Sequence, residues 1–141
     1  MNARSTTIPC LSYRDAAAAI QWLCDTFGFA KKAVYDGPDG TIVHSELTFG
    51  NGMVMVATHQ PDSEYGRMTA QPDEIGGRET QTVALIASDP DAIYRRAKAG
   101  GAQILRDIRD ESYGGRSFIC SDPGGHIWSV GSYDPWQAAS P

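Results

Sequence analysis

The strongest constraint on the fold is that one order of structural signals occurs twice along the chain. Each copy has an apolar strand, an aspartate that can cap a helix, a helical segment, a glycine that ends it and three extended runs. The capping residues Asp15 and Asp89 are 74 positions apart, and the helix-ending Gly28 and Gly101 are 73 apart. The sequence therefore predicts an α+β protein built from two βαβββ modules, with one helix in each module.

Local patterns support both helices and set the limits of the modules. In the first copy, apolar residues recur at helical spacing from Ile20 to Phe27. In the second copy, Asp89-Pro90 combines a capping residue with proline at the first helical position. The predicted organisation is a single domain over residues 1–141, with module 1 at 7–58, a linker at 59–79, module 2 at 80–133 and a tail at 134–141.

Composition and charge exclude several classes of protein. The 141 residues include 12 Lys and Arg against 17 Asp and Glu, a net charge of −5, and no long basic tract, so neither nucleic acid nor a membrane is an expected partner. The amino terminus has no apolar signal segment. Three cysteines without CxxC spacing do not predict a disulfide framework. A cytoplasmic location is predicted.

The paired modules and the Asp-Pro-Gly-Gly-His turn at 122–126 together resemble the vicinal oxygen chelate superfamily. That superfamily contains glyoxalase I, extradiol dioxygenases, fosfomycin-resistance enzymes and bleomycin-resistance proteins. The Tyr13-Arg14-Asp15-Ala16 start, the strand around His44 and the Ile127–Tyr133 ending look most like the bleomycin-resistance and glyoxalase-like branch. The resemblance implies curved mixed sheets around a cleft and a homodimer, in which modules are sometimes exchanged between chains.

The resemblance also implies where a metal would bind. Metal-using members carry His or Glu ligands at four equivalent strand positions. These positions fall here on Ile8, on Met55 or Val56, on Gln81 and on Ser129. Isoleucine cannot bind a metal, and glutamine and serine are weak neutral donors. No metal and no cofactor are therefore expected.

Strand alternation gives one candidate for chemistry. On the run Ile42 to Phe49, His44 and Glu46 share a face, whereas Val43, Leu47 and Phe49 are expected to pack on the helix. A carboxylate beside an imidazole could form an acid/base pair. A solvated strand face is the competing interpretation.

Within the linker, two interpretations remain open. The segment is polar and lacks periodicity, which is typical of a flexible connection between modules. Alternatively it is a lid, in which Tyr65, Arg67 and Met68 reach a ligand. His59, at the start of the segment, is expected to be solvated.

The predicted cleft is mostly apolar with a few polar groups, which is typical of a pocket for a small amphipathic molecule. The sequence favours a protein of the bleomycin-resistance type that sequesters such a molecule. An enzyme remains the alternative: a lyase, isomerase or dioxygenase that uses a divalent metal at non-standard ligands, or His44 and Glu46 as acid and base. The predicted ligand-binding residues are Ile8, Cys10, Met55, Gln81, Val83, Ser129 and Tyr133.

Overall fold

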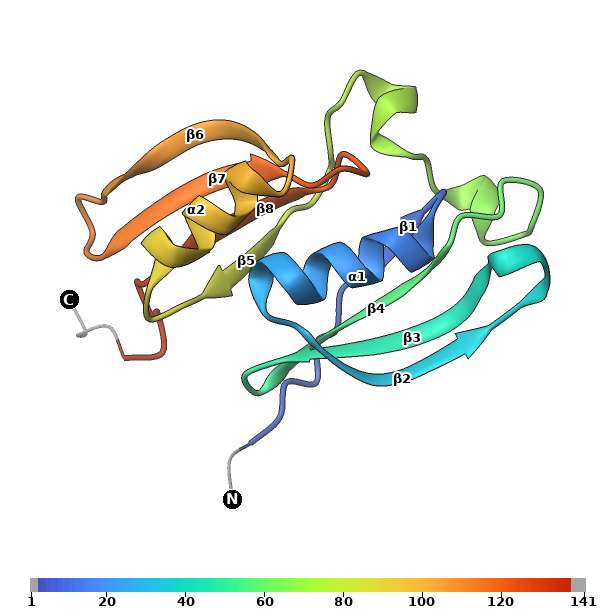
Figure 1. The fold of residues 1–141 in the computed structure, drawn as a ribbon, viewed down its shortest axis with the longest axis horizontal. Coiled ribbons are helices and arrows are strands. Elements are labelled where there is room, and N and C mark those ends of the chain that lie inside the picture. The colour runs from blue at the N-terminus through green and yellow to red at the C-terminus, as the bar shows by residue number, and fades with distance from the viewer. Residues whose placement is uncertain (1–2, 138–141) are drawn as a thin grey trace. The chain divides into compact units, whose positions relative to one another are not determined.

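The structure is a computed structural model that describes residues 3–137, and the chain divides into two compact units after Arg78 (Figure 1). Both units have the predicted βαβββ order, so the α+β fold class is confirmed. Unit 1 contains β1 (Cys10–Tyr13), α1 (Ala16–Phe27), β2 (Ala30–Asp36), β3 (Ile42–Phe49) and β4 (Gly52–Thr58). Unit 2 contains β5 (Val83–Ile86), α2 (Pro90–Ala99), β6 (Gln103–Asp110), β7 (Arg116–Ser121) and β8 (Ile127–Gly131).

Each unit has one four-stranded mixed sheet. The strand order is β1-β4-β3-β2 in unit 1 and β5-β8-β7-β6 in unit 2. The first strand of each unit runs parallel to the last, and the other neighbours are antiparallel. Because a parallel pair needs a crossover, the helix that follows the first strand lies across one face of its own sheet (Figure 1).

Helix α1 forms where the sequence predicts it. The Asp15 side chain accepts a hydrogen bond from the Ala18 amide, and Gly28 ends the helix with a φ of 92°, in the left-handed region that favours glycine. The periodic residues Ile20, Leu23 and Phe27 are all buried against the sheet. This apolar stripe fixes which face of the sheet the helix covers.

Helix α2 is more polar but is held at both ends. Asp89 accepts from the Ala92 amide, and basic side chains occupy the last turn, where they complement the helix dipole. Its buried face consists of Ile93 and Ala97. Fully buried Trp128 is part of the core of this unit.

Two of the predicted ligand-binding residues lie outside the strands. Strand β1 begins at Cys10, after Ile8, because Pro9 has no N–H with which to extend the ladder, although its carbonyl accepts from the Met55 amide at 2.9 Å. Strand β8 ends at Gly131, so Tyr133 lies beyond the sheet.

The segment between β4 and β5 forms two short 3-10 turns, Gly66–Met68 and Pro72–Ile75. Gln71 is buried, and its side-chain amide donates to the Ser12 carbonyl at 3.1 Å. Arg14 forms an ion pair with Asp73 at 2.7 Å. These contacts tie the middle of the segment to unit 1.

The side chain of His59, expected to be solvated, is only 6% exposed and lies 3.9 Å from Glu74. That expectation was wrong because the 3-10 turns fold back over the start of the segment. The lid candidates Tyr65 and Met68 are both exposed.

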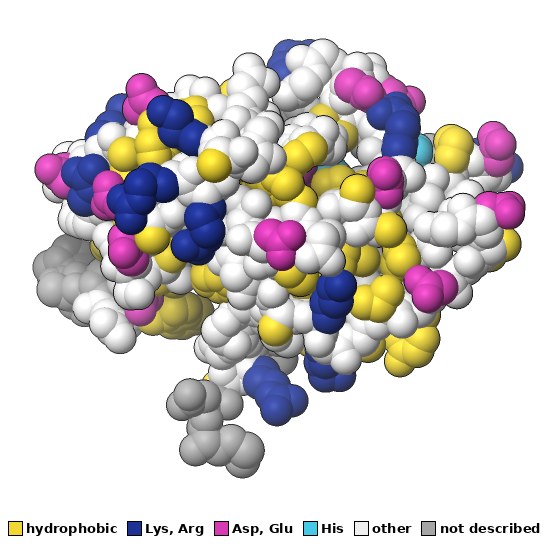
Figure 2. All heavy atoms as spheres, in the orientation of Figure 1, with side chains coloured by type: hydrophobic (Ala, Val, Ile, Leu, Met, Phe, Trp, Pro, Cys, Tyr) yellow, Lys and Arg dark blue, Asp and Glu magenta, His cyan; other side chains and the backbone are white. Residues whose placement is uncertain are grey.

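No helix among residues 3–137 has the length and apolar character needed to cross a membrane. On the side of the molecule drawn in Figure 2, acidic and basic side chains are interspersed, and no broad field of one sign is visible there.

Candidate functional site

The sheet of unit 1 has one face covered by α1 and one without a helix. Leu47, Val54 and Val56 are buried on the covered face. Strand register places Cys10, Met55 and Glu46 in one row across β1, β4 and β3, and residues paired in this way project from the same side of a sheet. Successive residues of a strand project from opposite faces, and Val56 lies on the covered face. Met55, together with the rest of its row, therefore lies on the helix-free face.

The helix-free face of unit 1 is defined here as Cys10, Ser12, His44, Glu46, Thr48, Met53 and Met55. It combines the thioethers of two methionines and the thiol of Cys10 with four polar side chains. The structure thus brings two of the predicted ligand-binding residues, Cys10 and Met55, onto one surface with the acid/base candidates.

His44 and Glu46 contact each other on this face. Nε2 of His44 lies 2.9 Å from Oε2 of Glu46, and the Lys32 ammonium donates to Oε1 at 3.2 Å. The His44 hydrogen bond, followed by that from Lys32, lowers the pKa of Glu46 from its ordinary value. The Tyr35 ring stacks on the imidazole, with ring centroids 6.0 Å apart. Glu46 is therefore a carboxylate held in its charged form.

One residue of this unit differs from expectation. Val43 was expected to pack on the helix but is 64% exposed, because a register shift between Tyr35 and Asp36 moves the start of β3 out of simple alternation. Of the predicted ligand-binding residues, Cys10 is exposed, and Ile8 lies just before the strand and is half-buried.

In unit 2 the helix-free face is centred on Ser129, which pairs with Ala84 on one side and Ile119 on the other. Val83 was expected to share this face with Ser129. It instead pairs with Trp128 on the side covered by α2, so that expectation was wrong, and Ala84 and Ile86 take its place. Gln81 is exposed and lies outside β5.

Tyr133 lies just past β8, against the turn between β6 and β7. Its ring meets Tyr113 edge-on with centroids 5.0 Å apart. Both rings are exposed to a considerable extent, at 36% for Tyr133 and 59% for Tyr113. Tyr133 is thus a predicted ligand-binding residue that remains accessible at that end of unit 2, and Tyr113, which was not predicted, adds a second exposed ring beside it.

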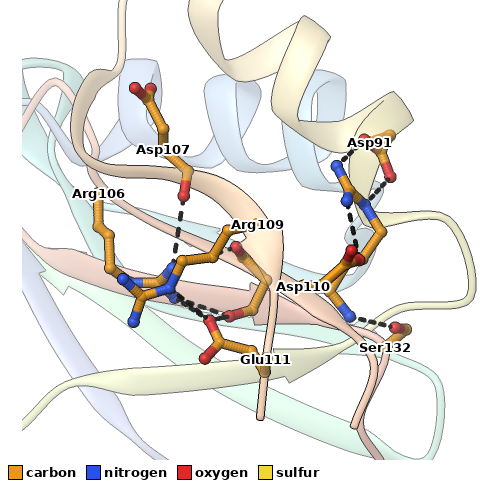
Figure 3. A network of polar contacts seen from close by, with 9 residues as sticks. Asp91, Arg106, Asp107, Arg109, Asp110, Glu111 and Ser132 are labelled. Atoms are coloured by element: carbon orange, nitrogen blue, oxygen red, sulfur yellow. Dashed lines mark hydrogen bonds and ion pairs between the residues drawn. The ribbon is translucent and has the colours of Figure 1, made fainter.

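A polar cluster on unit 2 was not anticipated from the sequence. Oε1 of Glu111 accepts from Ser117 Oγ at 2.8 Å and lies 2.9 Å from Nη2 of Arg106 and 3.2 Å from Nε of Arg109 (Figure 3). Ser117 pairs with Gly131 and Arg106 pairs with Ile119, which puts the cluster on the helix-free face. These contacts, with the Ser117 hydrogen bond first among them, lower the pKa of Glu111.

Simple alternation could not have revealed this cluster. Alternation along β6 puts Ile104 and Arg106 on one face, but a register shift between them leaves Ile104 opposite buried Cys120 and turns Arg106 to the other side. The available signal was the presence of two arginines, Arg106 and Arg109, in one strand.

The Asp-Pro-Gly-Gly-His turn has a structural role. One carboxylate oxygen of Asp122 accepts from the amides of Gly124 and His126, each at 3.0 Å, and the other accepts from the indole of Trp128 at 2.9 Å. The imidazole of His126 contacts the carboxylate of Glu79, which also accepts from the Ile127 amide. His126 is thus a packing residue at the start of β8.

The positions at which superfamily enzymes hold metal do not offer a matching donor set. Ile8 has no donor atom, Met55 offers only a thioether, and Ser129 offers a neutral hydroxyl. Among residues 3–137, no group of three His, Cys, Asp or Glu side chains is arranged to hold a metal ion. The residues present therefore do not fit the superfamily's divalent centre, which needs several nitrogen or charged oxygen ligands.

Residues 7–130 match the family model described as Glyoxalase/Bleomycin resistance protein/Dioxygenase superfamily, and the chain belongs to this family. It is 30% identical over 131 residues to the uncharacterized protein Rv0887c of Mycobacterium tuberculosis H37Rv, covering 93% of this chain and 76% of the relative. The uncharacterized protein Mb0911c of Mycobacterium bovis is equally similar, with 85% of its length covered.

Solved structures agree with this assignment. The crystal structure of TioX from Micromonospora sp. ML1 is 31% identical, with a TM-score of 0.69 over 90% of this chain and 97% of that one. A glyoxalase-related enzyme from Fulvimarina pelagi has a TM-score of 0.61 over 90% of this chain and 86% of that one. At 18% identity, the second likeness supports the fold alone.

Proposed function

We propose that this protein binds a small amphipathic molecule and sequesters it without a metal and without changing it chemically. The observation that carries the proposal is the composition of the superfamily's metal positions. There Ile8, Met55 and Ser129 provide apolar and neutral polar surface in place of charged ligands. Such surface can bind a ring through apolar burial, which contributes about 1.5–3 kcal/mol for a well-buried ring.

The residues proposed to contact the ligand lie on the two helix-free faces and next to them. Met55 and Cys10 supply polarizable sulfur groups, which adapt to the shape of an apolar ligand. The full set is Ile8, Cys10, Met55, Gln81, Ser129 and Tyr133, with Ala84 and Ile86 replacing Val83. Members of the superfamily often form dimers, and we propose a cytoplasmic homodimer, in which modules can be exchanged between chains.

An enzymatic role is the second candidate, because His44 and Glu46 are in direct contact at 2.9 Å. A carboxylate in hydrogen-bond contact with an imidazole is the arrangement that an acid/base pair for an isomerase or lyase requires. This candidate predicts that turnover of a substrate is lost in His44→Gln and in Glu46→Gln. Sequestration predicts that the wild-type protein, like both variants, leaves a bound compound chemically unchanged.

Calorimetry with 2-naphthylmethanol as the probe tests the binding proposal. We expect saturable binding to the wild-type protein and altered affinity in Ser129→Leu, which places a bulky group on the helix-free face of unit 2. Ser88→Leu, at an exposed position outside the strands, is the matched control and should bind as the wild type does. Absence of binding would refute the proposal, and catalytic consumption of a compound by metal-free protein would favour the enzyme.

A further inference from the structure

The arginine cluster on unit 2 gives a local positive charge to a protein that is acidic overall. Arg106 and Arg109 contact the same oxygen of a single carboxylate, Glu111, whose side chain is only 7% exposed. Two positive charges against one negative charge leave a net charge of +1 at this place, whereas the chain as a whole carries −5. On the face of the sheet that α2 covers, Asp110 and Asp91 both contact Arg116. These two acidic side chains are therefore engaged away from the cluster (Figure 3).

Arg109 is the member of the cluster with unused donors. It contacts Glu111 only through Nε, and its side chain is 59% exposed. Within residues 3–137, its two terminal Nη groups have no hydrogen-bond partner. The Nη edge of a guanidinium presents parallel N–H groups that match the two oxygens of a carboxylate. The contact with Glu111 fixes the orientation of this edge before any ligand arrives.

A row of paired residues runs from Arg109 across the same face, over buried Ser117, and reaches apolar surface at Ile86. Arg109 pairs with Ser117, Ser117 with Gly131, and Gly131 with Ile86, so the four residues form one row from β6 to β5. Gly131 has no side chain, and Ile86 is 43% exposed. Adjacent strands lie about 4.8 Å apart, and β8 and β6 are two strands apart, so their backbones are separated by about 10 Å. The Arg109 side chain extends from β6 and shortens the distance that a ligand with its ring over β8 has to span.

Aromatic groups flank this row at the end of the sheet. The hairpin turn that supplies Glu111 also carries Tyr113, which meets Tyr133 edge-on. Exposed aromatic rings provide flat surface for a second ring. The charged and apolar parts of the surface are thus adjacent, with the positive charge at one end.

We propose that this row is a subsite for a flat, apolar molecule that bears one carboxylate, with the carboxylate bound by Arg109 and the ring over Gly131 and Ile86. This inference rests on the proposed binding function and specifies the class of ligand. Arg106, Glu111 and Ser117 act as positioning residues that hold Arg109 in place. The neighbouring β7 residue Ile119 adds apolar contact.

Two probes that differ only in charge test the subsite. Calorimetry compares 2-naphthoate with 2-naphthylmethanol, using the full-length protein at low ionic strength. We expect the wild-type protein to bind the acid about tenfold more tightly than the alcohol, as one charge-assisted contact allows. Arg109→Gln should abolish this preference, because it should weaken binding of the acid much more than binding of the alcohol. Arg95→Gln, which removes the same charge from an exposed position on α2, should retain the preference.

The location of binding has an independent readout. In amide nuclear magnetic resonance spectra, 2-naphthoate should shift the signals of Ser117 and Gly131, and Arg109→Gln should reduce those shifts. If the alcohol binds and the acid binds no better, the subsite is refuted while the proposed function stands. If neither probe binds, the proposed function fails and the subsite fails with it. A preference for the acid that survives in Arg109→Gln also overturns the subsite.

Discussion

Replacement of Asp122 by alanine should strongly destabilise unit 2. Asp122 is 5% exposed and accepts three hydrogen bonds, from the amides of Gly124 and His126 and from the indole of fully buried Trp128. Water can reach the exposed Gly124 amide after the substitution, but it cannot reach the indole. A buried donor left without an acceptor costs about 1–3 kcal/mol, and bonds to a charged group are worth about 1.5–3 kcal/mol each.

These magnitudes give an expected loss of about 3–5 kcal/mol in the free energy of unfolding for Asp122→Ala, once rehydration of the exposed amide is allowed for. For a chain of this size, about 3 °C of melting temperature corresponds to each kcal/mol, so the expected fall is about 9–15 °C. Urea unfolding followed by circular dichroism measures the loss. Asp62→Asn, at an exposed position, is the control and should be neutral.

A double-mutant cycle isolates the indole contact. In Asp122→Asn the amide can present its oxygen either to the backbone amides or to Trp128, but not to both. Trp128→Phe removes the indole donor, so the second substitution should cost less in the Asp122→Asn background than alone, with a coupling of about 1 kcal/mol or more. A loss below about 1 kcal/mol for Asp122→Ala, or the absence of coupling, would refute the assigned role of the turn.

Three further outcomes follow from the local environments. Exposed Cys10 should react rapidly with a thiol reagent at pH 8, whereas Cys120, whose pKa burial raises to about 12, should react only on unfolding; equal rates would contradict this. Because contacts in the folded state lower the pKa of Glu111, the stability they add is present above its ordinary value of 4.5 and is lost as pH falls below it. Urea titrations from pH 6 to 3 should therefore show a weaker pH dependence for Glu111→Gln, and an identical profile would rule the contribution out. Gln71→Ala should speed proteolytic cleavage within residues 60–75, because its amide ties that segment to the Ser12 carbonyl, and an unchanged cleavage rate would argue against that tie.

Local patterns were sufficient to predict the order and the ends of most elements. Asp15, Asp89 and Gly28 act through hydrogen bonds and backbone angles within a few residues of themselves, so their effect can be read from neighbouring positions. The same holds for β3, whose predicted limits match the structure, and for the contact of His44 with Glu46, which are two residues apart on that strand.

Register and long-range contacts were decided only by the tertiary structure. A single shift in pairing reverses the face of every later residue in a strand, and no local pattern specifies where such a shift occurs. For this reason alternation misplaced Val43 and could not place Arg106 and Arg109 together on the helix-free face. Val83 was misplaced because its face depends on its pairing with Trp128, which lies 45 residues further along the chain. The sequence by itself determined which elements form and where most of them end, whereas the pairing of distant strands decided which side chains share a surface.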